Sequence, residues 1–171
     1  MNNLKKTRTL TISALLVAAY LLLDRFTIPI TPTLHISVKF AAIALAGCLY
    51  GAKIGACVGG LCDVIGYFAY PKGAFFWGFT LSAIIVGVIF GLIAGRKTPS
   101  IWRVLLAQIL CTIVVDLALN TYWLSLMYGM NAWIAFIGRY AEKLLMLIPM
   151  TGLIFLLWKV CNRKNNTQNI R

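Results

Sequence analysis

The sequence predicts an all-helical integral membrane protein: one domain, residues 1–171, built as a bundle of six transmembrane helices with both termini in the cytoplasm. Three observations predict this class. Hydrophobic residues make up 61% of the chain and charged residues 12%, whereas soluble domains contain about 45–50% apolar and about 25% charged residues. The mean hydropathy is +0.86, so lipid must cover much of the surface. The net charge of +12 comes from basic residues that mostly flank apolar runs, which favours cytoplasmic loops over nucleic-acid binding.

Apolar runs near the length of a membrane-crossing helix define the elements, and turn residues separate them. Pro29 and Pro32 make a loop of the segment after the first run. A tight turn at Gly51–Lys53 leaves the second helix unusually short, and Pro71-Lys72-Gly73 ends the third. The predicted helices cover residues 9–24, 39–51, 54–70, 76–95, 100–128 and 132–160.

Charged and capping residues delimit the last three helices. The fourth ends at Arg96 and Lys97. Thr98-Pro99 opens the fifth, because threonine is a good N-cap and proline suits the first helical position. Gly129 and Asn131 break the chain before the sixth.

With six crossings, the sixteen basic residues divide unequally between the two sides of the membrane. Eleven lie on the side of the termini and five on the other. Because loops rich in Lys and Arg stay in the cytoplasm, both termini are expected there. A cleaved signal peptide is the alternative interpretation of the basic N-terminus, but its removal would leave five crossings and force one basic end outward. The five opposite residues are Arg25, Lys39, Lys72, Arg139 and Lys143.

Small residues repeat at every fourth position, which lets helix backbones approach closely in lipid. The two longer series, which predict packing within the bundle, are Gly47, Gly51, Gly55 and Gly59, and Ala83, Gly87, Gly91 and Gly95. A shorter pair, Ala14 and Ala18, lies on the first helix, where it either packs internally or faces a partner subunit.

Ionisable groups inside the membrane are costly and are therefore candidates for a binding site. Asp63 lies near the middle of the third helix. Asn120 shares a face of the fifth helix with Asp116, and Arg139 shares a face of the sixth with Lys143. Most of these groups fall in the outer half of the bundle, where the surplus of cations favours a ligand that carries carboxylates.

Several of these groups also have a structural explanation. Asp116 and Glu142 could simply neutralise Arg139 or Lys143 in ion pairs. Arg25, at the outer end of the first helix, could extend to lipid phosphates.

Aromatic residues gather near the expected outer interface, and Phe76, Trp77 and Trp123 are the candidates for stacking on a flat ring. An aromatic belt at the membrane surface is the alternative explanation. Thr80 follows Trp77 by three positions on the same helix face, although its hydroxyl could bond its own backbone instead.

The sequence predicts neither an enzyme nor a protein with a cofactor or metal of its own. His35 is the single histidine and the five cysteines form no CxxC pair, so no metal site is expected. No Ser–His–Asp set indicates a nucleophile. The segment from Gly91 to Thr98 resembles a phosphate-binding loop, but its spacing is one residue short and it ends a lipid-buried helix. Any ATP is therefore expected to be used by partner subunits.

Five segments carry a family resemblance. They are the AxxxA pair at Ala14 and Ala18, the loop from Arg25 to Leu34, Gly47-Cys48-Leu49-Tyr50-Gly51, Asp63-Val64-Ile65-Gly66, and, most specific, the block from Pro71 to Ala83. With these segments the chain resembles, over almost its whole length, the S components of energy-coupling-factor (ECF) vitamin transporters, and more narrowly their folate branch.

This resemblance implies a bacterial plasma-membrane protein that binds folate at high affinity in a cavity on the outer side. It also implies a separate ATP-hydrolysing module, made of one transmembrane coupling subunit and two ATPase subunits. Ala14 and Ala18 would then be the docking face for the coupling subunit.

The chemistry of folate suggests a role for each candidate residue. Asp63 would accept the adjacent N–H donors of the pterin, and the aromatic candidates would stack on its rings, with Thr80 and Asn120 beside them. Charge-assisted bonds to the two carboxylates of the glutamate tail would come from Arg25, Arg139 or Lys143.

Three other interpretations stay open. An S component for another small vitamin or precursor is the nearest, although a neutral ligand would not need three outer cations. A small membrane enzyme would need a nucleophile or a metal cluster. A passive scaffold would leave Asp63 and Arg139 without a purpose.

Overall fold

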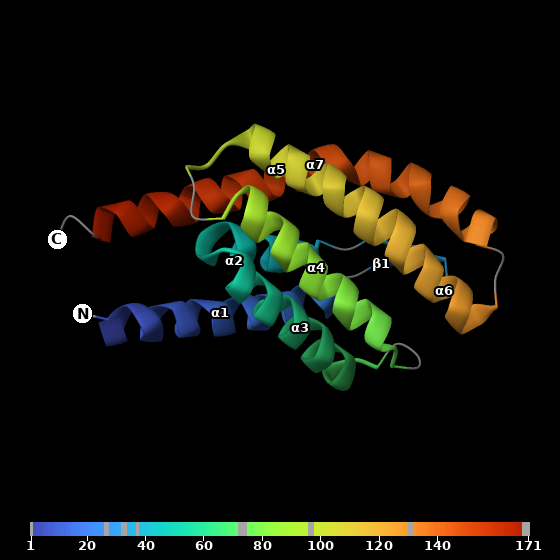
Figure 1. The fold of residues 1–171 in the computed structure, drawn as a ribbon, viewed down its shortest axis with the longest axis horizontal. Helices are drawn as coiled ribbons and strands as arrows, with labels where there is room; N and C mark the ends of the chain where they lie inside the picture. The colour runs from blue at the N-terminus through green and yellow to red at the C-terminus, as the bar shows by residue number, and fades with distance from the viewer. Residues whose placement is uncertain are drawn as a thin grey trace.

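The computed structural model describes residues 2–25, 28–31, 34–36, 38–71, 75–95, 98–129 and 132–168. Its α-helices are α1 (Asn2–Arg25), α2 (Phe40–Tyr50), α3 (Ala52–Ala69), α4 (Trp77–Ile93), α5 (Ile101–Cys111), α6 (Asn120–Tyr128) and α7 (Ala132–Gln168). A π-helical segment, η1 (Thr112–Leu119), joins α5 to α6 without a break. Two short strands, β1 (Ile28–Thr31) and β2 (Leu34–Ile36), follow α1. Figure 1 shows the helices side by side in an elongated bundle.

The helices lie close to the predicted ranges, with two differences at the ends. α1 begins at Asn2 rather than at residue 9, and α7 extends to Gln168 rather than to residue 160. Both extensions are polar and basic. A helix satisfies its own backbone hydrogen bonds, so it can continue into water beyond the apolar run from which its length was predicted.

The segment after α1, which the sequence predicts as a loop, adds a short β-hairpin to the helical bundle. β1 and β2 pair as an antiparallel hairpin, in which Ile28 lies opposite Ile36 and Pro29 opposite His35. Isoleucine and threonine favour strands, and Pro29 lies in an edge strand, where proline is tolerated. The prolines predict a loop, whereas the flanking β-branched residues form a short hairpin.

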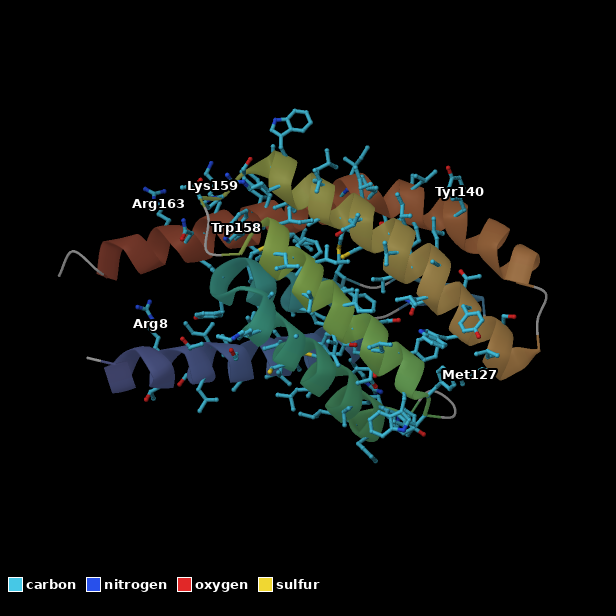
Figure 2. The ribbon with its side chains drawn as sticks, in the orientation of Figure 1. Arg8, Met127, Tyr140, Trp158, Lys159 and Arg163 are labelled. Atoms are coloured by element: carbon cyan, nitrogen blue, oxygen red, sulfur yellow. The ribbon has the colours of Figure 1, made fainter. Side chains whose placement is uncertain are left out.

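Among the described residues, four helical stretches are long and apolar enough to cross a membrane: Thr7–Arg25, Ala52–Ala69, Ile101–Met127 and Lys143–Arg163. Two shorter apolar helices, Phe40–Tyr50 and Trp77–Ile93, accompany them. These stretches confirm the prediction of a helical membrane protein. The beginning of α1 and the end of α7 lie at the same end of the bundle (Figure 1). Arg8, Lys159 and Arg163 are also at that end (Figure 2).

The short helix α2 forms the centre of the bundle. Eight consecutive residues of α2, from Ala41 to Cys48, are buried, as expected for a helix that is apolar on every face. α2 contacts α1, α3, α4 and α7. Protein rather than lipid therefore surrounds this helix.

Glycines allow α2, α3 and α4 to meet backbone to backbone. A Cβ added to Gly47 would lie 2.8 Å from the carbonyl oxygen of Gly87, and one added to Gly55 would lie 2.5 Å from the same oxygen. Gly51 has a φ of 87° and forms the turn between α2 and α3, a conformation that glycine adopts without strain. The prediction that the glycine series pack inside the bundle is confirmed.

An ion pair joins α1 to the start of α2. The Nζ atom of Lys39 donates to Oδ1 of Asp24 at 2.7 Å, and the Asp24 side chain is only 5% exposed. The same ammonium lies 5.3 Å from the ring centre of Tyr20 and 5.6 Å from that of Phe40. The Lys39 ammonium is thus held by one carboxylate and by two aromatic rings, and the faces of such rings attract a cation.

Replacing Gly87 by alanine is expected to lower the free energy of unfolding by about 1–3 kcal/mol, the usual result of overpacking a tight contact. The added Cβ would meet the carbonyl group of Gly55 on α3. Gly152→Ala on α7 is the matched control, because a Cβ there meets no atom within 4 Å. Thermal unfolding in detergent measures both variants, and equal midpoints would contradict the backbone contact.

The Asp24–Lys39 pair is expected to show strong coupling in a double-mutant cycle. Asp24→Asn or Lys39→Met alone leaves a partly buried charge uncompensated, which costs about 3–5 kcal/mol. The double variant should cost clearly less than the sum of the two single changes, because it leaves no unpaired charge. Additive unfolding free energies would show that the pair does not stabilise the junction of α1 and α2.

Candidate functional site

Asp63 and Thr80, two of the predicted site residues, meet between α3 and α4. The Thr80 hydroxyl donates to Oδ2 of Asp63 at 2.7 Å. The alternative interpretation, in which this hydroxyl bonds the backbone of its own helix, is therefore wrong. Thr80 is buried, and Asp63 is half-buried. Lys39 and Asp24 are close enough to act on Asp63 electrostatically. Asp63 therefore belongs to a polar cluster between α3 and α4, near the junction of α1 and α2.

A separate pocket lies between α2, α4, α7 and the continuous helix of α5, η1 and α6. Its free volume is about 50 Å³, enough for on the order of three water molecules. One side is largely apolar and the other carries polar side chains. The lining residues are Phe40, Ala44, Val86, Phe90, Gln108, Cys111, Thr112, Val115, Asp116, Asn120, Lys143, Met146, Met150 and Ile154.

Lys143 and Asn120 are the predicted site residues that line this pocket. Nζ of Lys143 lies 3.7 Å from Oδ1 of Asp116, and both side chains are 18% exposed. The alternative in which Asp116 neutralises Lys143 is thus confirmed. Asn120 is 7% exposed, and its Oδ1 atom has no hydrogen-bond partner among the described residues. A buried acceptor in this state requires water or a ligand to compensate for its loss of hydration.

Phe76 and Trp123 form an aromatic contact where α4 begins beside α6. Their ring centres are 5.5 Å apart at 54°. Gly78 makes room for them, because a Cβ there would lie 2.5 Å from Cδ2 of Trp123. The indole Nε1 of Trp123 is buried and unpartnered in the described part of the chain. One turn of helix therefore presents an unpartnered acceptor at Asn120 and an unpartnered donor at Trp123.

Trp77 does not join this contact. It is 73% exposed, and its ring packs at 5.0 Å against Phe75. Phe75 in turn contacts Tyr67 and Phe68 of α3. This outward group fits the alternative of an aromatic belt.

Arg25, a predicted cation of the site, does not line the pocket with Lys143. Arg25 is exposed at the end of α1, with its guanidinium 5.4 Å from the ring centre of Tyr70. The side chains of Arg139 and Glu142 lie outside the part of the chain that the structure describes. The structure thus separates the predicted residues into the Asp63–Thr80 cluster, the pocket with Asn120 and Lys143, and the Phe76–Trp123 contact.

Sequence reasoning left Gln108, Thr112 and Lys39 out of the site. The first two precede Asp116 and Asn120 at intervals of four residues. In a regular α-helix three such steps drift about 120° around the axis, so this spacing alone does not predict that all four residues share one face. Lys39 was counted only as one of the cations opposite the termini. Its proximity to Asp63 depends on the contact between α1, α2 and α3, which no local pattern reveals.

Comparisons with known proteins agree with this architecture. The family model described as "ECF transporter, substrate-specific component" matches residues 8–161. The chain is 33% identical over 160 residues to the folate transporter FolT of Clostridium novyi, which covers 94% of this chain and 93% of that protein. It is also 33% identical over 149 residues to the folate transporter FolT of Leuconostoc mesenteroides, covering 84% of this chain and 80% of that protein.

A solved structure shares the fold. The crystal structure of FolT bound with folic acid superposes with a TM-score of 0.81 at 29% identity, over 88% of this chain and 92% of that one. Members of the matched family are integral plasma-membrane transport components rather than enzymes. The chain described here belongs to the substrate-specific components of ECF transporters.

Proposed function

We propose that this chain is the high-affinity, membrane-embedded folate-binding subunit of an uptake system. The observation that carries the proposal is its similarity to a protein solved with folic acid, in fold and in sequence, over most of both chains. The two folate transporters support it with 33% identity each. The pocket between α4, α7 and the α5–η1–α6 helix adds a partly polar cavity inside the bundle.

The proposed topology has six crossings, with both termini in the cytoplasm. It follows if α2 and α4, which are apolar but short, also pass through the membrane, α2 within a shell of other helices. The common position of the ends of α1 and α7 supports an even number of crossings (Figure 1). Arg8, Lys159 and Arg163 support a cytoplasmic location for that end.

The ring of folate and its tail need different partners. The pterin presents adjacent N–H donors, which a carboxylate such as Asp63 accepts, and Phe76 and Trp123 offer faces for stacking. Trp77 contributes only if it turns inward. The two tail carboxylates need cations, for which Arg25 and Arg139 are proposed. Lys143 can serve the tail only if it leaves Asp116.

The energy for uptake is proposed to come from a separate ECF module with one transmembrane coupling subunit and two ATPases. Ala14 and Ala18 are both exposed on α1, which favours a partner or lipid over internal packing. Leu10 and Leu15 of the same helix are 73% and 68% exposed. This small-residue face is the proposed docking site for the coupling subunit.

Folate is expected to bind the purified protein, and Asp63→Ala is expected to weaken binding by about tenfold or more, the usual loss for a hydrogen bond to a charged group. Isothermal titration calorimetry in detergent measures both. Tyr122→Phe is the control, because Tyr122 is exposed on α6. Unchanged affinity would remove Asp63 from the site, whereas a wild-type protein that binds another vitamin and not folate would overturn the proposed function.

Ala14→Phe is expected to abolish folate uptake in cells that contain the ECF module while leaving folate binding by the purified protein within about twofold. A bulky ring there would keep the helix backbones of the two subunits apart. Ala118→Phe provides the control, since Ala118 is an exposed alanine on a different helix. Normal uptake by the Ala14 variant would show that the coupling subunit docks elsewhere.

A further inference from the structure

Four polar residues form a stripe along the pocket wall. Gln108, Thr112, Asp116 and Asn120 follow one another at intervals of four, and all four line the pocket. In a helix they would span about 18 Å at 1.5 Å per residue. Figure 1 shows this helix running beside α7, which supplies Lys143. A polar stripe of this length inside an apolar bundle is costly unless something in the pocket binds to it.

The π-helical segment keeps the stripe on one face. In an α-helix, four residues turn about 40° past a full turn, so three such steps would rotate Asn120 about 120° away from Gln108. A π-helical turn contains more residues, because its hydrogen bonds link residues five apart. Over η1, four residues therefore fall short of a full turn and reverse this drift. The Thr121 side chain bonds across the same interval of five residues, because its hydroxyl donates to the carbonyl oxygen of Asp116 at 3.5 Å.

The charges in the pocket cancel. Lys143 and Asp116 form an ion pair across it at 3.7 Å, so the polar wall carries no net charge. A carboxylate entering beside Lys143 would also approach Asp116, whose repulsion would offset the attraction of the ammonium. The described side chains of the pocket are therefore poorly suited to an anion.

Among the described residues that line the pocket, Asn120 carries an unpartnered acceptor. Oδ1 of Asn120 is buried without a hydrogen bond, and the carboxylate of Asp116 adds further acceptor positions. Only a group with N–H or O–H donors satisfies both. Opposite them, Phe40, Val86 and Phe90 provide an apolar wall, against which a flat group can lie.

We infer that this pocket is a subsite for a neutral, flat, N–H-donating portion of the ligand, held by Asn120 and Asp116, and not for a carboxylate. The inference rests on the proposed folate-binding function and assigns the pocket to one chemical part of that ligand. Folate offers such donors on its pterin ring and on the amine and amide of its linker, whereas its carboxylates are confined to the tail. Met146 and Met150 line the pocket with flexible side chains, which can move aside to admit a group larger than the present free volume.

Whether Asp116→Asn weakens or strengthens folate binding tests the inference directly. If a neutral donor binds there, removing the acceptor charge is expected to weaken folate binding about tenfold. If a tail carboxylate binds at Lys143 instead, the same substitution removes a repulsion and strengthens binding. Calorimetry on the purified full-length protein with folate measures the change. Thr121→Ser is a control on the same helix, at a residue that does not line the pocket.

Asn120→Leu provides a second variant of similar size without an acceptor, and it is also expected to weaken folate binding about tenfold. Two fragments locate the donor. If Asn120→Leu binds 6-hydroxymethylpterin tenfold more weakly than the wild type, the ring lies in this pocket rather than at Asp63. If it binds p-aminobenzamide, a linker fragment without a carboxylate, tenfold more weakly, the linker lies there. Either result supports the inference. If Asn120→Leu does not fold, Asp116→Asn alone decides, because it preserves the shape of the side chain.

Stronger binding by Asp116→Asn, or unchanged folate affinity in both variants, would overturn the inference while leaving the proposed function intact. Absence of folate binding by the wild-type protein would instead overturn the proposed function. The two failures are therefore distinguishable in one set of titrations.

Discussion

A carboxylate inside a lipid-embedded bundle needs a partner, and this requirement determines how the helices of this protein are joined. The three acidic residues whose side chains the structure describes each have one, and each pair connects two different elements. The pairs are Asp24 with Lys39, Asp63 with Thr80, and Asp116 with Lys143. They join α1 to the start of α2, α3 to α4, and η1 to α7. The glycine contacts bring the backbones of α3 and α4 close enough for the second pair to form.

The fold class could be predicted from the sequence because lipid imposes a strong compositional constraint. Helix positions followed from apolar length and from turn residues such as Gly51 and Gly129, both of which have positive φ. The hairpin after α1 was missed because two prolines masked the flanking β-branched residues. The sequence does not predict the polar ends of α1 and α7, because hydropathy identifies only the apolar part of a helix that lies in the membrane.

The site could be predicted only in part, since residue types are visible in a sequence but partners across the bundle are not. Asp63 and Thr80 were both nominated, yet their contact depends on how α3 packs against α4. Lys143 was expected to serve a ligand, and the structure shows it paired with Asp116. The π-helix has no evident signature in the residues 112–119. The assumption of a regular α-helix therefore hid the alignment of Gln108 with Asn120.

The compensation of charge leaves Asn120 Oδ1 and Trp123 Nε1 buried without partners among the described residues, and we propose that a bound vitamin supplies hydrogen bonds to both atoms. Mass spectrometry of the small molecules released from the detergent-purified protein tests this most directly. We expect folate or a close derivative at nearly one molecule per chain. A different vitamin, or no bound molecule after growth in folate-containing medium, would contradict it.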